Sequence, residues 1–147
     1  MFLGTYLAKF AAGRRVAVPA PLRRDLGESF ILAKWYEGCL VLVARDSWEA
    51  LLKRLTGSQK MLPTPVRDTE RFIFSSAYES VPDDQGRIVI PDRLVSYANL
   101  EDELYFIGLG DRIEIWNKES WLEKEKSLAK DSAAYIEELA RDERKRQ

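Results

Sequence analysis

The strongest constraint on the fold of this chain is that its sequence repeats itself once. Arg15-Val16-Ala17-Val18-Pro19 returns 72 residues later as Arg87-Ile88-Val89-Ile90-Pro91, and each run is followed within three residues by a leucine. A unit of about 50 residues is too small to bury a good core alone, so we expect the two copies to share one core. Three further pairs of segments match in the same order, with spacings that change by a residue or two: Phe30-Ile31-Leu32 with Leu104-Tyr105-Phe106, Cys39-Leu40-Val41-Leu42 with Ile113-Glu114-Ile115-Trp116, and Asp46-Ser47-Trp48 with Glu119-Ser120-Trp121.

Each copy is expected to contain a strand, a loop, a second strand, a short helix and two further strands. The runs at residues 15–18 and 87–90 are β-branched, and each is followed by a proline. Proline cannot donate to a sheet but suits the first turn of a helix. We therefore expect short helices over residues 20–25, ending at Gly27, and over residues 92–98, ending near Asn99. The other expected strands cover residues 5–10, 29–34, 39–44, 103–108 and 112–117.

Longer helices are expected after the strands of each copy. Asp46 with Glu49, and Ser120 with Glu123, have the spacing of a capping box, the second ahead of a helix that extends to about residue 141. Thr64-Pro65 marks another helix start, because proline suits the first helical turn. The buried side of that helix is expected to hold three apolar residues: Val66, Phe72 and Ile73.

The expected domain organisation follows from these elements. Gly57 and Pro63 make residues 56–63 the predicted linker between the copies. The first half is predicted to cover residues 1–55, and the linker with its helix residues 56–76. The second half, with the C-terminal helix, is predicted to cover residues 77–147.

The composition excludes the usual sets of catalytic residues. The 147 residues include no histidine, which removes the commonest general base and metal ligand. One cysteine, Cys39, allows no internal disulfide and no multi-thiolate metal site, and its alignment with Ile113 predicts a buried, unreactive thiol. We therefore expect no enzyme, no catalytic residue, no cofactor, no metal and no small-molecule substrate.

Hydropathy and cysteine content indicate the cellular compartment of the protein. No run approaches the roughly 18–20 apolar residues that span a bilayer, and the first residues lack the pattern of a signal peptide. A free cysteine without an export signal fits a reducing compartment. The expectation is a cytoplasmic protein with no membrane partner.

Charge is distributed unevenly along the chain. The net charge is −1, which excludes a uniformly basic coat. Residues 1–60 carry ten Lys or Arg and five Asp or Glu, a balance of +5, so the remaining 87 residues have a balance of −6. Such asymmetry is typical of a face that meets a polyanion, with an uneven solvated surface as the alternative.

A short loop precedes each strand that ends at proline. These loops are Ala11-Ala12-Gly13-Arg14-Arg15 and Asp83-Asp84-Gln85-Gly86-Arg87. Glycine permits close approach of a backbone to a ligand, and arginine offers a planar fork of donors for a phosphate or a guanine edge. An Asp four residues before the Arg can hold such a loop by accepting backbone N–H groups. The alternative is a hairpin turn whose Arg pairs with a nearby carboxylate.

The sequence resembles the MraZ family of bacterial regulators, encoded at the head of the division and cell-wall gene cluster. The resemblance covers about residues 1–125. It rests on Met1-Phe2-Leu3-Gly4, on the two half-repeats, on Asp83-x-x-x-Arg87 followed by Ile-Val-Ile-Pro, and on Gly110-Asp111-Arg112-Ile113-Glu114-Ile115-Trp116.

This resemblance implies a fold and a function. The implied fold is mainly β with flanking helices (α+β), in which two AbrB-like swapped-hairpin half-motifs form one pseudo-dimeric β-barrel. The implied function is transcription regulation, with a nucleoid-associated, ring-shaped homo-oligomer binding direct repeats in promoter double-stranded DNA upstream of its own operon. The Asp-x-x-x-Arg loops are the DNA-contacting part in that family. Carried over to this chain, the expected DNA-binding residues are Gly13, Arg14, Arg15, Gln85, Gly86 and Arg87.

The first loop departs from the family pattern. Ala11 stands where the motif has Asp, and Arg14 stands where it has Gly. We expect the first loop to supply most of the affinity, because it lacks an acid and has two cations. The second loop, which holds two acids, is expected to supply more of the selectivity.

Ala11 also keeps a second class of function open. The alternative is a protein-interaction scaffold, or an antitoxin-like AbrB-fold protein, with weakened DNA binding. Arg23 and Arg24 are expected on the short helix beside the first loop, either touching phosphates or lying on a solvated face.

Overall fold

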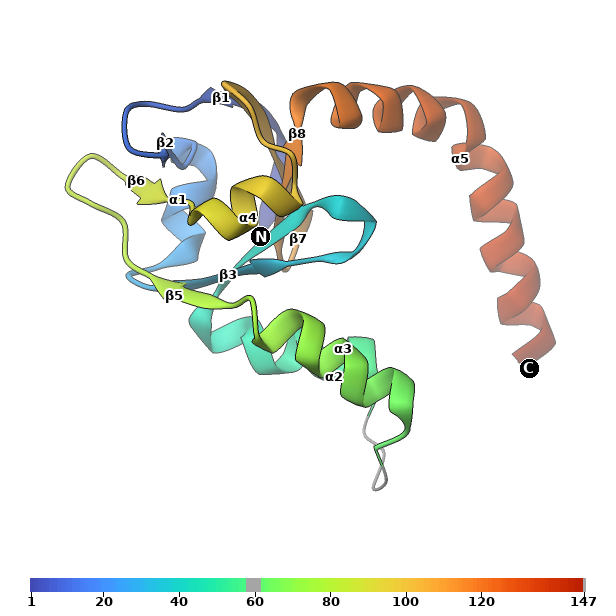
Figure 1. Cartoon of the computed structure of the whole chain (residues 1–147). Coiled ribbons are helices and arrows are strands. Elements are labelled where there is room, and N and C mark those ends of the chain that lie inside the picture. The colour runs from blue at the N-terminus through green and yellow to red at the C-terminus, as the bar shows by residue number, and fades with distance from the viewer. Residues whose placement is uncertain (58–61, 147) are drawn as a thin grey trace.

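The computed structural model describes residues 1–57 and 62–146 (Figure 1). The first copy of the repeat contains β1 (Phe2–Lys9), β2 (Arg15–Ala17), α1 (Ala20–Leu26), β3 (Phe30–Lys34) and β4 (Leu40–Ala44), followed by α2 (Trp48–Thr56). After α3 (Thr64–Phe74), the second copy contains β5 (Tyr78–Ser80), β6 (Arg87–Val89), α4 (Asp92–Tyr97), β7 (Glu103–Gly110) and β8 (Ile113–Asn117). The long helix α5 (Lys118–Arg146) completes the chain. The expected order of strands and short helices in each copy is confirmed.

The larger sheet has six strands in the order β1-β7-β8-β4-β3-β5, all antiparallel. Read from either edge, this order gives the first strand of one copy, then the hairpin of the other copy. β1 therefore pairs with β7 of the second copy, and β5 pairs with β3 of the first. The two copies share one sheet, as the small size of each unit predicts.

The smaller sheet is a two-stranded antiparallel ribbon of β2 and β6, called here the β2–β6 ribbon. Its register places Val16 opposite Ile88, which are equivalent residues of the two copies. The hydrogen bonds follow the same symmetry, since Val18 N donates to Gly86 O and Ile90 N donates to Arg14 O, both at 3.0 Å. An approximate two-fold axis therefore passes through the ribbon.

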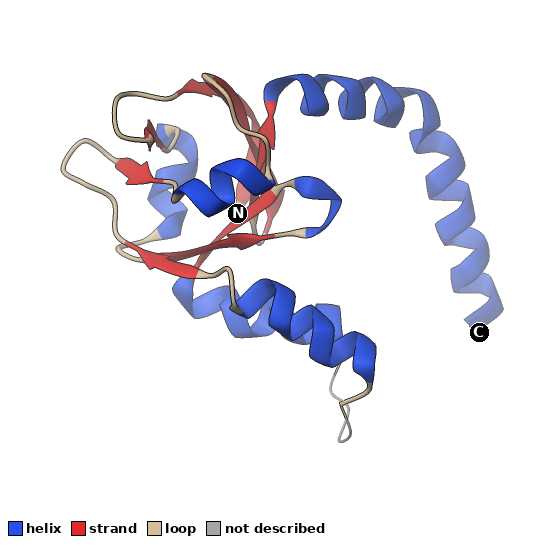
Figure 2. Cartoon of the chain, in the orientation of Figure 1, coloured by secondary structure: helices blue, strands red, loops and turns tan. Residues whose placement is uncertain are grey.

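The core lies on both faces of the six-stranded sheet. On one face, Leu40 and Leu42 of β4 pack in a cluster that contains the ribbon residues and the short helices α1 and α4. On the other face, Val41 and Val43 pack with the residues of α2, α3 and α5. Burial of both faces explains why β4 is a continuous apolar run rather than an alternating one. Figure 2 shows the helices placed around the strands, with the far end of α5 standing away from them.

The fold class is confirmed as a mixture of helices and mainly antiparallel strands. The strand hydrogen bonds among residues 1–57 and 62–146 form two sheets and do not close into one barrel. No helix in this described part of the chain is both long and apolar enough to cross a membrane. Of the predicted linker, residues 58–61 lie outside the described residues.

Several element boundaries differ from those predicted. β1 begins at Phe2 rather than at residue 5, because it pairs with β7 along its whole length and not only where its own side chains alternate. Neither capping box forms. The chain turns through a 3-10 segment before α2, with no side-chain cap, and α5 is capped instead by Asn117, whose Oδ1 accepts from Ser120 N at 3.0 Å.

The predicted buried side of α3 is only partly correct. Ile73 is buried, whereas Val66 is half-buried and the Phe72 side chain is exposed. Phe72 packs edge-on against Tyr97, with ring centroids 5.7 Å apart, so one side of its ring faces solvent.

Candidate nucleic-acid interface

The two arginine loops lie at the two ends of the β2–β6 ribbon. We call residues 11–15 loop 1 and residues 83–87 loop 2. Each loop is closed by an equivalent backbone hydrogen bond, from Ala11 N to Arg15 O at 2.7 Å and from Asp83 N to Arg87 O at 2.9 Å. Both loops project from the same side of the molecule, away from α5 (Figure 1). The structure thus brings the six predicted site residues to one side.

Loop 2 is held by the carboxylate of Asp83. Its Oδ1 accepts the backbone N–H groups of Gln85 and Arg87, both at 2.9 Å, and its Oδ2 accepts from Arg87 Nε at 2.9 Å. The backbone N–H of Arg87, followed by the Arg87 side chain, lowers the pKa of Asp83 below its ordinary value. The pairing of the loop arginine with a nearby carboxylate, expected as the alternative for these loops, therefore occurs between Arg87 and Asp83. The same carboxylate also fixes the loop backbone through its two backbone hydrogen bonds.

Loop 1 lacks this carboxylate and turns by a different backbone route. In loop 1 two consecutive residues have positive φ, Gly13 at 76° and Arg14 at 59°. In loop 2, residues 83–87, Gly86 is the single residue with positive φ. Two consecutive left-handed residues are typical of a type I′ turn, and arginine is an unusual residue there. Arg14 Nε lies 3.6 Å from Asp92 Oδ1 at the start of α4, and the Arg15 side chain is exposed.

Arg23 lies against loop 2, which corrects the expectation that it lies beside loop 1. Arg23 Nη1 donates to Gln85 O at 3.3 Å. The guanidinium also covers Gly86, since a Cβ added there would lie 1.6 Å from Arg23 Nη1. Proximity along the chain was misleading, because antiparallel pairing of β2 with β6 carries the chain past loop 2 before α1 begins. The sequence signal that could have indicated this placement is the match between residues 15–18 and 87–90, the two runs that contain β2 and β6.

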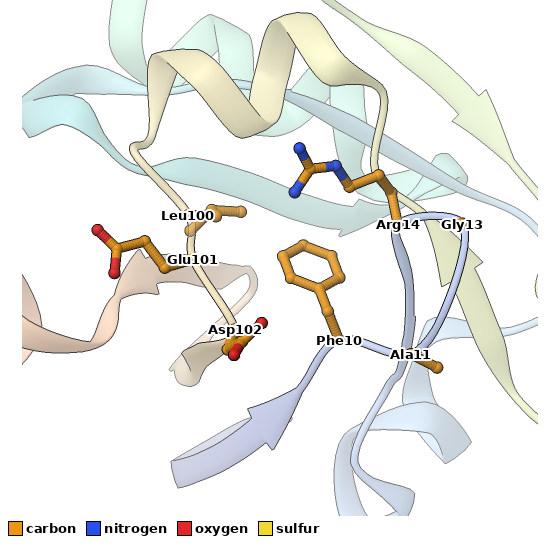
Figure 3. A pocket seen from close by; sticks show the side chains of 7 residues that line it. All are labelled: Phe10, Ala11, Gly13, Arg14, Leu100, Glu101 and Asp102. Carbon is orange, nitrogen blue, oxygen red and sulfur yellow. The ribbon is translucent and has the colours of Figure 1, made fainter.

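A pocket of about 730 Å³ lies beside loop 1 (Figure 3). The Arg14 and Phe10 side chains both line this pocket, and Phe10 N donates to Asp102 O at 2.8 Å, which ties the start of the loop to the segment before β7. The charged residues of the lining are one cation, Arg14, and two acids, Glu101 and Asp102. The remaining lining residues are Phe10, Ala11, Gly13 and Leu100. The described residues contain no cluster of three His, Cys, Asp or Glu side chains that could hold a metal ion.

The single thiol is buried, as its alignment with a core position predicts. Cys39 is 1% exposed, and its Sγ donates to Tyr36 O at 3.4 Å. Burial, together with the nearby Glu114 carboxylate, raises the pKa of Cys39 well above its ordinary value. A thiol in this state is neutral at physiological pH and is a poor nucleophile.

Comparisons with known proteins converge on one family. A family model described as "MraZ protein, putative antitoxin-like" matches residues 1–65 and 73–143. Proteins named Transcriptional regulator MraZ are similar over most of their length. The one from Clostridium acetobutylicum is 38% identical over 130 residues (86% of this chain, 89% of the relative), and the one from Alkaliphilus oremlandii is 41% identical over 140 residues (93% of each). A third, from Alkaliphilus metalliredigens, is 42% identical over 124 residues (82% of this chain, 84% of the relative).

Proposed function

The chain belongs to the MraZ family, and on that premise we propose that it is a transcriptional regulator that binds promoter DNA sequence-specifically through loops 1 and 2. The observation that carries the proposal is the placement of two arginine loops, related by the internal repeat, on one side of the molecule (Figure 1). The contact residues proposed are those predicted: Gly13, Arg14, Arg15, Gln85, Gly86 and Arg87.

The two loops offer different contacts to DNA. Loop 1 presents two arginines and no acid, so it is suited to phosphate contacts that do not depend on sequence. In loop 2 the hydrogen bonds that Asp83 accepts from the backbone and from Arg87 Nε, together called here the Asp83 clamp, fix the Arg87 side chain. The guanidinium N–H groups of Arg87 that are not bonded to Asp83 are therefore presented in a set orientation. A pre-oriented guanidinium discriminates base edges better than a mobile one, and repulsion by Asp83 and Asp84 disfavours random phosphate contacts.

The proposed target is a set of direct repeats upstream of the chain's own operon, in the division and cell-wall cluster. A ring of copies that presents its loops repeatedly gains effective concentration on repeated sites, which makes weak single contacts sufficient. The acidic C-terminal half does not oppose this, since α5 leaves the body on the side away from the loops (Figure 1). Nucleoid association in the cytoplasm would follow from such binding.

The domain organisation proposed for this function is pseudo-dimeric. Residues 1–55 and 77–147 act as two AbrB-like halves of swapped-hairpin type, joined by residues 56–76. The support is the exchange of first strands, in which β1 pairs with β7 and β5 pairs with β3. In the proposed arrangement, one chain would carry both of the loops that a homodimer would take from its two subunits.

The test is fluorescence anisotropy with DNA from upstream of the gene, against a shuffled duplex, over a salt series. Preference for the native repeats and a steep loss of affinity with salt are expected, because phosphate contacts release counterions. Equal and weak binding to both duplexes would overturn the proposal. Ala11 favours that outcome, and the second candidate function is then an antitoxin-like interaction scaffold, tested by recovery of a defined protein partner.

A further inference from the structure

We propose that the free edge of β1 binds an extended, acidic peptide segment of another protein as an added strand. The place is a groove of about 540 Å³ between β1 on one side and the start of α1 on the other, called here the β1 groove. None of the six proposed DNA contacts lines this groove. The inference therefore goes beyond the proposed DNA binding and does not depend on it.

β1 has one unpaired edge. It is the outermost strand of the six-stranded sheet, and all of its residues pair with β7. The backbone N–H and C=O groups of an antiparallel strand are directed toward both of its edges, so the edge away from β7 carries a row of groups available to another strand. Among residues 1–57 and 62–146, no strand pairs with this edge. Main-chain pairing along such an edge is one way in which a sheet binds an extended peptide.

The β1 groove follows the second half of the strand. Residues 5–9 form one wall, and residues 17–20 with Arg23 form the other. Gly4 has a φ of 101°, which departs from extended backbone, and Leu3 O already accepts from Tyr6 Oη at 3.2 Å. The edge that is left for a partner therefore begins at residue 5. Strand residues rise about 3.4 Å each, so a partner segment of about five residues matches this length.

The β1 wall of the groove offers apolar surface to a partner. Leu7 is 50% exposed on the solvent side of β1. Tyr6 and Ala8 lie on the opposite side of the strand, where they are half-buried against the core. A strand added beside β1 would cover part of these side chains, so apolar residues are expected in the bound segment.

The charges of the groove select an acidic partner. Its charged lining residues are Lys9 and Arg23, both cations. In the described part of the chain, no carboxylate lies within ion-pair distance of either. Glu103 is opposite Lys9 in the register of β1 with β7, but its carboxylate pairs with Lys118 Nζ at 3.1 Å. Two cations without an acidic partner are complementary to acidic side chains in the added strand.

An acidic peptide fits the β1 groove better than DNA or a second copy of the chain. DNA would satisfy the cations, but it cannot form a strand ladder with the β1 edge. A second β1 brings Lys9 and no acid, so its charge is not complementary. The other edge strand, β5, has three residues, and its Glu79 already pairs with Arg45 at 3.2 Å.

The first experiment measures the anisotropy of three labelled heptapeptides with the full chain. The probe alternates valine with glutamate, one control alternates valine with lysine, and the other is the probe methylated at its backbone nitrogens. The probe should bind, and the lysine control should bind about 3- to 10-fold more weakly, because its charges are repelled. The methylated control should bind about tenfold more weakly or less, because it cannot donate to the β1 edge.

The second experiment locates the bound peptide on the protein. Amide hydrogen exchange within residues 5–9 should slow when the probe is added, because added strand hydrogen bonds protect amides. Lys9→Glu should weaken probe binding about 3- to 10-fold, since it replaces attraction by repulsion. Lys126→Glu makes the same change at an exposed residue of α5 and should alter affinity less than about twofold. Thermal unfolding shows whether each variant is folded.

Several outcomes would overturn the inference. They are absence of probe binding, a control peptide that binds as tightly as the probe, and equal probe affinity in folded Lys9→Glu and Lys126→Glu. Protection of residues 5–9 by promoter duplex alone would assign the groove to DNA, and protection that rises with protein concentration alone would assign it to a second copy. If Lys9→Glu does not fold, the three peptides with the parent protein still decide. Promoter binding is measured separately, so loss of the peptide site leaves the proposed function standing.

Discussion

Val16 lies directly opposite Ile88 in the β2–β6 ribbon, and the two residues occupy the same place in the two copies of the repeat. Each is 1% exposed, so this pair lies inside the core that both copies share. The same pair marks the approximate two-fold axis that sets loop 1 and loop 2 at opposite ends of the ribbon. Packing at this axis therefore supports both candidate DNA contacts at once.

Truncation at the axis should destabilise the whole protein. We expect Ile88→Ala to lower the free energy of unfolding by about 2–5 kcal/mol, because it leaves a cavity in a buried ribbon. The adjacent Val89 is 48% exposed, and Val89→Ala should cost less than about 1 kcal/mol. Urea unfolding followed by tryptophan fluorescence measures both. Equal losses in the two variants would contradict the placement of Ile88 in the shared core.

The two loops should differ in what they contribute to DNA binding. We expect Arg15→Ala to weaken promoter and shuffled duplexes alike, because loop 1 contributes charge without sequence reading. Arg87→Ala should lower the ratio of promoter to shuffled affinity by about tenfold, since a fixed guanidinium at a base edge contributes about 1–3 kcal/mol of discrimination. Anisotropy at one salt concentration suffices. The same loss on both duplexes for both variants would show that the loops do not divide the work.

The Asp83 clamp should make loop 2 sensitive to acid. Its folded-state pKa is lowered, so its contribution to stability is present above the unfolded pKa of about 3.9 and is lost as the pH falls through the folded value. Asp83→Asn should therefore unfold at lower urea than the parent protein at pH 7, and the difference should shrink near pH 3. Asp84→Asn is the control, and an equal effect of both variants at pH 7 would exclude the clamp.

The Cys39 thiol should be silent until the protein unfolds. Because burial raises its pKa, the group stays protonated in the folded state, whereas the unfolded thiol has a pKa of about 8.5. Stability from this group is therefore full below that pH and falls as the pH rises above it, a dependence that Cys39→Ala should lose. A disulfide reagent should react with the native protein far more slowly than with protein in urea. Rapid native reaction would contradict the burial of Cys39.

Much of the fold was predictable, because the β-branched runs and the prolines determine local structure and the repeat shows that the same elements occur twice. The short helix after Pro19 and the hairpins of both copies follow from residue type and spacing. What no local pattern states is which strands pair. The attachment of β1 to β7 and the start of β1 at Phe2 depend on a partner far along the chain, and so does the place of Arg23 at loop 2.

Buried polar contacts were also outside the reach of sequence patterns. The apolar residues of β8 predict a strand, but they do not predict that Glu114, 8% exposed within it, accepts from Trp116 Nε1 at 2.9 Å. The cap of α5 is similar, because Asn117 is the last residue of β8 and only the turn geometry brings its side chain to Ser120 N. Such contacts depend on backbone geometry that residue types alone do not specify.

The pairing of β1 with β7 has a consequence for how the protein is made. β1 is synthesised before the other strands of the sheet, yet every residue from Phe2 to Lys9 pairs with Glu103–Gly110 of the second copy. The nascent chain therefore carries β1 without its partner until β7 has been synthesised, so the six-stranded sheet cannot be completed before then. A chain that stops before β7 leaves β1 as an unpaired edge strand, and such an edge promotes pairing with other chains.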